Sequence, residues 1–206
     1  MRKILGVLLM LMGIALVLGS GALALTNRQQ EQTANAHTQA VLPELRAQIR
    51  QVQATEPEIQ PVPEEYPLQE DFSMTEKIIN GYGYIGTLTI AELGLELPVM
   101  SEWDSQRLQI APCRYTGSTR GENLVIMAHN YGVHFGNLSR LSVGSQVQFA
   151  DMDGQIWNYR VAAMDVLAAE AVEEMTDGAY DLTLFTCATN RTHRVTVRCN
   201  RIEEME

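Results

Sequence analysis

The chain has 206 residues, a formal net charge of -10 and 46% hydrophobic residues. A large share of these hydrophobic residues lies in one block, residues 4–25, and no second block of that kind follows. This distribution excludes a multi-span membrane protein and argues against a simple cytosolic protein. The acidic excess lies behind the block, so the rest of the chain is not expected to bind nucleic acid.

Residues 4–25 contain no charged side chain and predict a transmembrane helix. At about 1.5 Å per residue they reach roughly 33 Å, which is enough to cross a bilayer core of about 30 Å. Arg2 and Lys3 precede the block, so the positive-inside rule predicts residues 1–3 in the cytoplasm and the remainder outside. A cleaved signal peptide is the alternative, because Ala22-Leu-Ala24 resembles a cleavage site. Such peptides have apolar regions of about 7–15 residues, so length favours a single-pass anchor.

Residues 26–78 are predicted to form a stalk and linker. Val41, Leu45 and Ile49 follow one another at helical spacing and predict a short amphipathic helix, with Pro43 in its first turn. The prolines between residues 57 and 67 then predict an extended, semi-rigid spacer.

Residues 79–206 are predicted to form one mainly β domain. Short alternating or apolar runs predict strands at 83–91, 95–100, 123–128, 145–150, 155–167, 181–187 and 194–201. Asp153-Gly154 predicts a hairpin with a type I′ turn. Helical turns are expected at 137–141 and 169–175, without a long helix. Many short strands of this kind indicate a barrel or a sandwich.

A cysteine and an arginine flank the last predicted hairpin. One strand ends at Cys187 and the next begins at Arg194, so in a regular hairpin their Cβ atoms would lie roughly 4.5–5.5 Å apart. A guanidinium beside a thiol favours the thiolate and can donate hydrogen bonds to an oxyanion. Spacing alone leaves a second interpretation open, a buried structural cysteine beside a surface arginine.

A thiol nucleophile also needs an imidazole partner. His129 ends the predicted strand 123–128, where a rigid element can aim its side chain into a site. His134 lies in the following loop and is the alternative. His37 falls in the stalk and His193 in the hairpin loop, so we select His129.

The two other cysteines are expected to be structural. By two-residue alternation Cys199 lies on the opposite face from Arg194, which favours a core thiol. Cys113 is expected to be structural too, and a disulfide between them is only a guess. No Cys-x-x-Cys pair or zinc-like His/Cys spacing occurs, so no metal site is predicted.

Several segments resemble the sortases, the cysteine transpeptidases of Gram-positive cell surfaces. Leu184-Phe-Thr-Cys187 resembles their Leu-x-Thr-Cys signature. The segment 192–198 is similar to the one that holds their essential arginine, which maps onto Arg194. The segment 125–130 resembles the strand that ends in their catalytic histidine, which maps onto His129. Residues 85–99 are similar to their opening strand pair, and the whole resemblance covers about 79–203.

The resemblance implies a closed, eight-stranded sortase β-barrel behind an N-terminal transmembrane helix. It implies that Cys187 attacks an LPXTG-like C-terminal sorting signal of an exported protein, and that His129 protonates the departing amine. Arg194 would hold the substrate and the oxyanion, with Thr186 as a helper in substrate binding. An amine of cell-wall precursor or of a pilin would then release the acyl group. No cofactor or metal is required for this chemistry.

Features that differ among sortases leave the class and two other functions open. The short connection 167–183 argues against class B. Thr192-His-Arg194 resembles the pilin-polymerising class C, and a single N-terminal anchor fits a housekeeping-like or class D enzyme.

The family usually has glycine before its histidine, whereas this chain has Ala128. That departure keeps a catalytically silent, surface-anchored interaction module open. A thiol–disulfide protein is disfavoured, because neither remaining cysteine stands at redox-motif spacing.

Overall fold

The computed structural model describes residues 2–55, 73–177, 179–187 and 192–202. The proline-rich spacer and residues 188–191 of the last hairpin loop lie outside these ranges. The elements are α1 (Arg2–Ala54), β1 (Lys77–Ile79), β2 (Tyr82–Ile90), η1 (Ala91–Leu93), β3 (Leu95–Met100), α2 (Arg107–Ile110), β4 (Cys113–Thr116), β5 (Leu124–Ala128), η2 (Leu138–Arg140), β6 (Gln146–Asp151), β7 (Ile156–Ala168), α3 (Val172–Thr176), β8 (Leu182–Cys187) and β9 (His193–Arg201).

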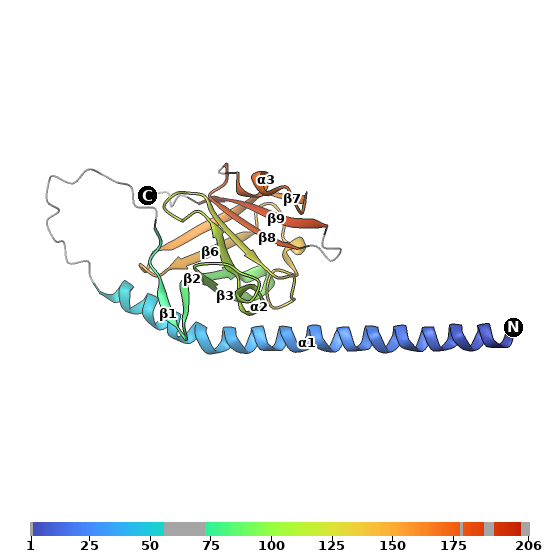
Figure 1. Ribbon diagram of the computed structural model, residues 1–206. Helices are drawn as coiled ribbons and strands as arrows, with labels where there is room; N and C mark the ends of the chain where they lie inside the picture. Colours follow the sequence, from blue (N-terminus) through green and yellow to red (C-terminus); the bar gives the residue numbers. More distant parts are fainter. Residues whose placement is uncertain (1, 56–72, 178, 188–191, 203–206) are drawn as a thin grey trace.

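The strands form a closed barrel beside one long helix (Figure 1). Their order is β1-β2-β3-β4-β5-β8-β9-β7-β6, and a further pairing of β6 with β2 closes the sheet on itself. The strands β2 to β9 make the closed eight-stranded barrel, while β1 extends β2 at the rim. Gly86 permits the closure, because a Cβ atom there would clash with the Ala150 carbonyl oxygen of β6. The predicted mainly β barrel is confirmed.

Most of the predicted strands are found within one or two residues of their expected bounds. The two that the sequence did not indicate are β1, with three residues, and β4, with four. The hairpin at Asp153-Gly154 is present, but the type I′ turn is wrong. Asp151 and Gln155 are joined across a three-residue turn in which Gly154 alone has a positive φ, of 80°. This is a longer hairpin loop, closed by a left-handed glycine.

The barrel interior is filled by side chains from alternate strand positions, and Cys199 lies among them. Cys113 belongs to a second cluster, between the barrel and α1. Both thiols are free and buried, so the guessed disulfide between them is wrong, whereas their structural role is confirmed. Burial raises the pKa of each thiol to about 12.

Residues 2–54 form one continuous helix rather than an anchor followed by a separate short helix. Residues 26–40 contain neither glycine nor proline and are rich in glutamine and alanine, so nothing interrupts the helix there. Pro43 lies inside the helix and not in its first turn. The last turns of α1 lean away from the axis of the rest (Figure 1), as expected downstream of an internal proline.

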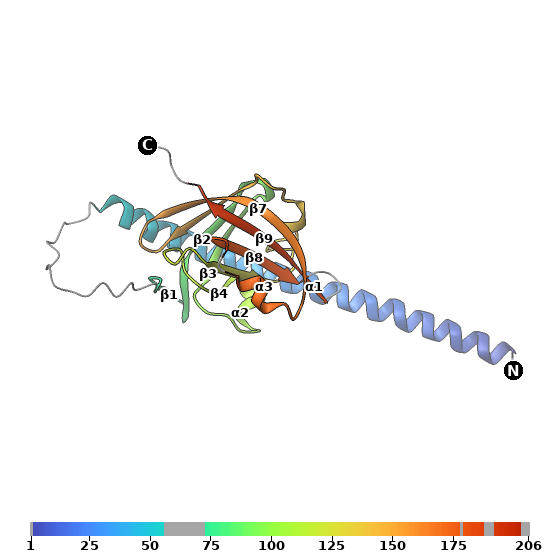
Figure 2. The ribbon, with the colours of Figure 1, turned by 90° about the horizontal axis from the view of Figure 1, so that it is seen from above.

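The C-terminal half of α1 packs along the side of the barrel, as the view from above also shows (Figure 2). Its buried residues recur every three or four positions: Ala34, Thr38, Val41, Leu42, Leu45 and Ile49. They pack on β2, β3 and α2, and His37 Nε2 lies 2.6 Å from the hydroxyl of Tyr84. Arg46 forms an ion pair with Glu96 of β3.

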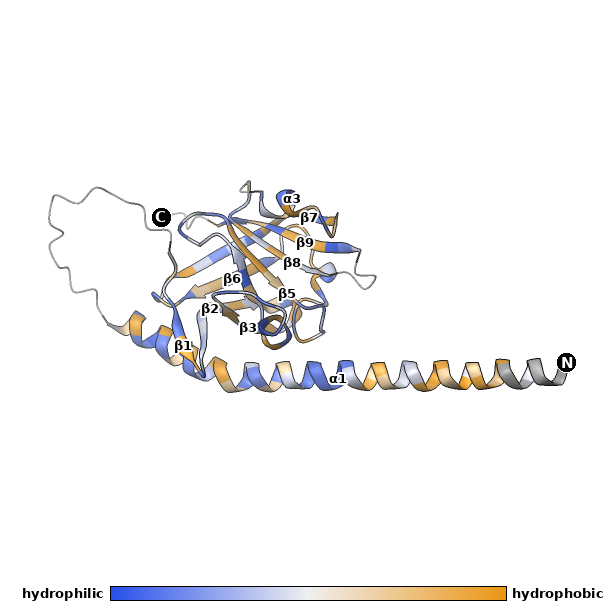
Figure 3. Cartoon of the chain, viewed as in Figure 1, coloured by the Kyte–Doolittle hydropathy of each residue, from blue (hydrophilic) through white to orange (hydrophobic). Residues whose placement is uncertain are grey.

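The N-terminal half of α1 projects beyond the barrel and is apolar (Figure 3). Its large apolar side chains from Leu9 to Leu25 are exposed. Among the described residues there is one helix, α1, that is both long enough and apolar enough to cross a membrane.

We expect Leu45→Ala to lower the free energy of unfolding by about 2–5 kcal/mol, because Leu45 is fully buried between α1 and the barrel. Denaturant titration of the full chain in detergent, followed by the fluorescence of Trp103 and Trp157, would measure this change. Glu44→Ala is the matched control on the exposed face of the same helical turn. Equal stabilities of the two variants would contradict the helix docking.

Candidate active site

Two parallel strands bring distant parts of the chain to one edge of the barrel. β5 and β8 pair in parallel from Leu124↔Leu182 to Ala128↔Thr186. His129 follows directly after β5 and Cys187 ends β8, so both positions fall at the same edge. Thr186 Oγ1 donates a hydrogen bond of 2.7 Å to the carbonyl oxygen of Ala128, and its side chain is 3% exposed. This buried bond fixes the register of the two strand ends.

The hairpin of β8 and β9 adds the arginine. Its antiparallel register pairs Cys187 with Arg194, Phe185 with Thr196 and Thr183 with Arg198. The predicted position of Arg194 directly opposite Cys187 is therefore confirmed at the level of the backbone. The half-buried side chain of Arg194 shares its face of the sheet with Thr196 and Arg198 by two-residue alternation.

The outer face of β5 and β8 carries an apolar cluster. Phe185 of β8 is buried there against Val125 of β5 and Met175 of α3. Tyr115 of β4 meets Phe185 edge-on at 5.4 Å between ring centroids, and Trp103 stacks on Tyr115 at 5.4 Å. This aromatic row leads to a cleft of about 410 Å³ lined by Ser101, Glu102, Trp103, Arg114, Tyr115, Thr116 and Gly117. By alternation, position 187 belongs to the same face as Phe185.

The structure separates the two candidate histidines. His129 is half-buried at the strand end, and its ring centroid lies 4.9 Å from that of Tyr131. The ring of His134 lies 5.5 Å from that of Tyr131 and is 0% exposed. Burial, with smaller contributions from His129 and His37, lowers the pKa of His134 to about 4. His134 is therefore a neutral imidazole that is fully buried. The geometry favours His129 as the imidazole of the site.

The loop that follows His129 is folded tightly and held by α1. The carbonyl oxygen of Tyr131 accepts a hydrogen bond of 2.8 Å from Gly136 N–H, and a Cβ atom at Gly136 would lie 2.5 Å from the Asn130 carbonyl oxygen. On the other side, Tyr131 donates its hydroxyl to Gln30 Oε1 and Val133 N–H donates to Glu31 Oε1, each at 3.3 Å. Sequence reasoning missed these two α1 residues, since nothing in the spacing links positions 100 residues apart.

Ala128 does not crowd the outer face of the barrel. Its side chain is 4% exposed and packs in the interior core with Leu184 and Val197. The methyl group that replaces the usual glycine hydrogen therefore points away from the edge where Cys187 ends its strand. The departure from the family pattern removes no space from that edge.

Arg198 has a structural task in the fold. It is 4% exposed and pairs with Asp165 at 3.5 Å. It donates to the main-chain carbonyls of Glu174 and Met175, and to Thr183 Oγ1 at 3.3 Å. These bonds pin α3 over the outer face of β8. Arg198 is therefore occupied, which leaves Arg194 as the arginine of the strand pair next to Cys187.

The remaining thiols do not suit redox chemistry. Cys113 and Cys199 are both buried in apolar clusters, so neither offers an accessible partner for thiol–disulfide exchange. Within the described ranges no group of three or more His, Cys, Asp and Glu side chains is placed to hold a metal ion.

A closed β-barrel that gathers a cysteine, a histidine and an arginine at one edge has the parts of a thiol-dependent acyl-transfer enzyme. The sortase domain model matches residues 88–202, which is more than half of the chain. The chain belongs to the sortase family. Family and fold together identify an enzyme of the sortase transpeptidase type.

Solved sortases share the fold. Sortase C1 from Streptococcus agalactiae is 21% identical over 62% of this chain and 72% of its own, with a TM-score of 0.54. Sortase C-1 from Actinomyces oris is 23% identical over 58% and 74%, with a TM-score of 0.52. A Clostridium perfringens sortase D5 transpeptidase is 20% identical over 62% and 83%, with a TM-score of 0.52.

The chain spans 66% of the sortase C1 of group B Streptococcus pilus island 1, at 23% identity and a TM-score of 0.51. At these identities the likeness shows the fold alone. No curated protein matches the sequence.

We expect Arg198→Met to lower the free energy of unfolding by about 2–3 kcal/mol, because it removes charge-assisted hydrogen bonds to the carbonyls of α3. Arg194→Met, four residues away on the same face, should lower it by less than about 1 kcal/mol, because that side chain is only half-buried. Denaturant titration of both variants would measure the difference, and the reverse order of stabilities would exchange the structural assignments of the two arginines.

The pKa of His134 predicts a loss of stability in acid. Its pKa is about 4 in the folded chain and about 6.5 when unfolded, so only the unfolded chain takes up the proton between these values. The contribution of His134 to stability is fully present above about pH 7. It is lost as the pH falls towards 4, by about 3 kcal/mol. His134→Asn should flatten this part of the curve of unfolding free energy against pH, and a variant curve parallel to that of the wild type would contradict the assignment.

Proposed function

We propose that the chain is a membrane-anchored cysteine transpeptidase that cleaves an LPXTG-like C-terminal sorting signal of exported proteins. The main support is the register of β5, β8 and β9, which gathers the positions of His129, Cys187 and Arg194 at one edge of the barrel. The acyl group passes to an amine, and the two candidate acceptors are cell-wall precursor and a pilin.

The first half-reaction cleaves the peptide. The Cys187 thiolate attacks the carbonyl carbon of a Thr-Gly-type bond, and Arg194 donates hydrogen bonds to the oxyanion that forms. The C–N bond then breaks, and the His129 imidazolium gives its proton to the departing amine. The substrate's acyl group remains on Cys187 as a thioester.

The second half-reaction forms the new bond. The acceptor amine attacks the thioester carbonyl, His129 takes the amine's proton, and Cys187 leaves as the thiolate. An amide replaces the thioester, and the starting protonation states are restored. Water competes with the amine, so excluding bulk water from the strand ends favours transfer over hydrolysis.

The apolar cluster on the outer face suits an extended peptide. The half-buried Tyr115 and the exposed Trp103 stack on each other and form an aromatic surface over the buried Phe185 of the strand that ends at Cys187. A sorting signal lying along this surface would place its apolar side chains there and its scissile bond at the strand end. The expected part of Thr186 in substrate binding stays a prediction. Its hydroxyl is engaged by the Ala128 carbonyl, which supports a positioning role instead.

We place the barrel outside the cell, with residues 4–25 in the membrane and residues 1–3 in the cytoplasm. The support is the apolar, exposed N-terminal half of α1 (Figure 3) and the two basic residues that precede it. This location would expose the site to exported substrates and to surface amines.

The proposal is tested by incubating the full chain in detergent with sorting-signal peptides and an amine. Mass spectrometry should show a thioester on the peptide containing Cys187, followed by the amide product. Cys187→Ala should form neither, and Arg194→Ala should lower the rate about 10²–10³-fold by loss of oxyanion stabilisation. If the wild type forms no acyl-enzyme with any peptide of a varied set, the transpeptidase proposal fails.

The two histidines provide a matched pair for the same assay. His129→Ala should lower the rate about 10²–10⁴-fold, because the amine then leaves without a general acid. His134→Asn, five residues away, should keep most of the activity at pH 8, where its effect on stability is small. Full activity in His129→Ala would remove His129 from the mechanism.

A further inference from the structure

The helix α1 joins its apolar half to the catalytic domain without a break. Residues 4–25 make up the predicted membrane segment, and the first contact with the barrel comes at Gln30. All four intervening residues, 26–29, are helical and lack glycine and proline. The connection is therefore a short stretch of regular helix rather than a flexible tether.

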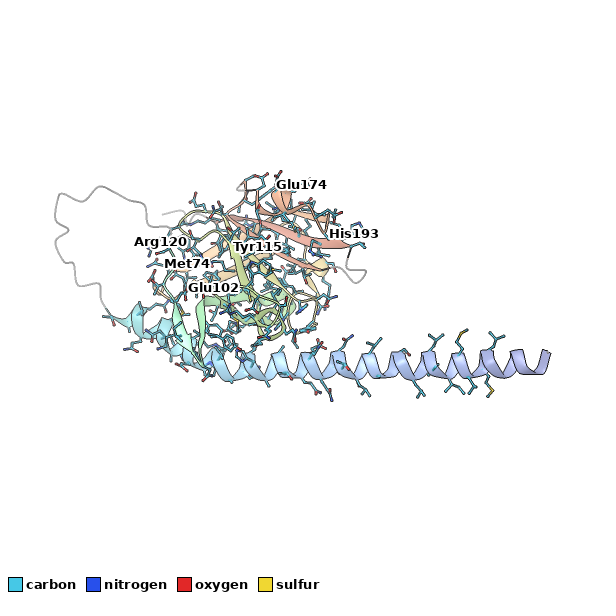
Figure 4. All side chains as sticks on the ribbon, in the orientation of Figure 1. Met74, Glu102, Tyr115, Arg120, Glu174 and His193 are labelled. Carbon is cyan, nitrogen blue, oxygen red and sulfur yellow. The ribbon has the colours of Figure 1, made fainter. Side chains whose placement is uncertain are left out.

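The barrel is docked with its catalytic edge towards the membrane half of α1. Gln30 and Glu31 contact Tyr131 and Val133, in the loop that begins at His129. His193, at the start of β9, lies at the end of the barrel from which the free part of α1 projects (Figure 4). Met74 and Arg120 lie at the opposite end in the same view.

The helix α1 is packed firmly against the barrel in the turns that follow its membrane segment. Gly132 of the loop that begins at His129 faces the helix, since a Cβ atom there would lie 2.9 Å from Glu31 Oε1, at the end of that flexible side chain. Burial, together with the nearby Glu31 charge, raises the pKa of Tyr131, as expected for a phenol held against the helix. Ala34 and Thr38 are buried one and two turns further on. The lean at Pro43 comes after these contacts, so it does not loosen the part between the membrane and the catalytic edge.

We propose that α1 is a rigid ruler that holds the catalytic edge at a fixed height above the bilayer, and thereby sets the spacer length that the enzyme accepts between a substrate's cleavage site and its own membrane segment. This inference rests on the proposed transpeptidase function and on the membrane placement of residues 4–25. From Leu25 to Glu31 the helix rises about 9 Å. An extended chain covers about 3.3 Å per residue, so this height corresponds to a spacer of about three residues between the substrate's cleavage site and its own membrane segment.

If α1 sets this height, the spacer length at which a substrate is turned over fastest should increase when the helix is lengthened. The full chain is reconstituted in phosphatidylglycerol vesicles with substrates that carry one accepted sorting motif, a spacer of graded length and a single membrane-spanning helix. Seven helical residues inserted after Asn27 would raise the barrel by about 10 Å and keep its orientation to within about 20°, since seven residues make nearly two full turns. The best spacer should become longer by about three residues.

Two controls separate this inference from the proposed function. A Gly/Ser insertion of the same length at the same place should broaden the spacer profile without a defined new optimum, because the linker becomes flexible. A soluble peptide with the same motif should be turned over equally by the wild type and both insertion variants. Equal turnover of that peptide with superimposable spacer profiles for all three proteins would overturn the ruler and leave the transpeptidase proposal standing. Failure of the wild type on every peptide would instead remove the proposed function.

Discussion

The site depends on the parallel pairing of β5 with β8. Parallel neighbours end at the same edge of a sheet, so this pairing alone brings position 129 next to position 187 across 58 residues of sequence. A register slip of one residue would turn every side chain of β8 to the other face of the barrel. It would place the core residues Leu182 and Leu184 outside and remove Thr186 from the Ala128 carbonyl. The packed interior and that one buried hydrogen bond therefore select the register that brings positions 129 and 187 to the same edge.

The sequence predicted those parts of the fold that have strong local signals. Alternation placed most strands, the Cys187–Arg194 spacing predicted their pairing, and the resemblance gave the closed barrel and the family. The features that the sequence did not predict are those without a local signal. β4 has four residues and an irregular register with β5, so no alternation marked it. The contacts of Gln30 and Glu31 with the loop after His129 join positions about 100 residues apart, and only the folded chain shows them. The same holds for His134, since periodicity alone does not show that a loop residue is fully enclosed.

Arg194 and Arg198 lie on the same face of β9, but they differ in burial and in their contacts. They stand four residues apart, yet their surroundings differ, because Arg198 donates hydrogen bonds to the carbonyls of Glu174 and Met175 in α3. Arg198 is enclosed by carbonyl oxygens of α3, a threonine hydroxyl and Asp165, and these partners compensate for the burial of its charge. Arg194 is half-buried and pairs with Cys187 at the strand ends. The short helix thus packs Met175 on the outer face, and its position depends on an arginine that the proposed mechanism does not use.

The burial of Cys113 and Cys199 has a practical consequence. Alkylating reagents react with thiolates, and burial raises the pKa of both of these groups to about 12, so they are held as thiols at neutral pH. A maleimide or iodoacetamide label taken up by the folded chain would therefore report on position 187 alone. The natural sequence, without any cysteine removed, is suited to counting competent sites by their labelling stoichiometry. The same chemistry offers a place for a single fluorophore, from which the approach of a bilayer or a substrate could be followed.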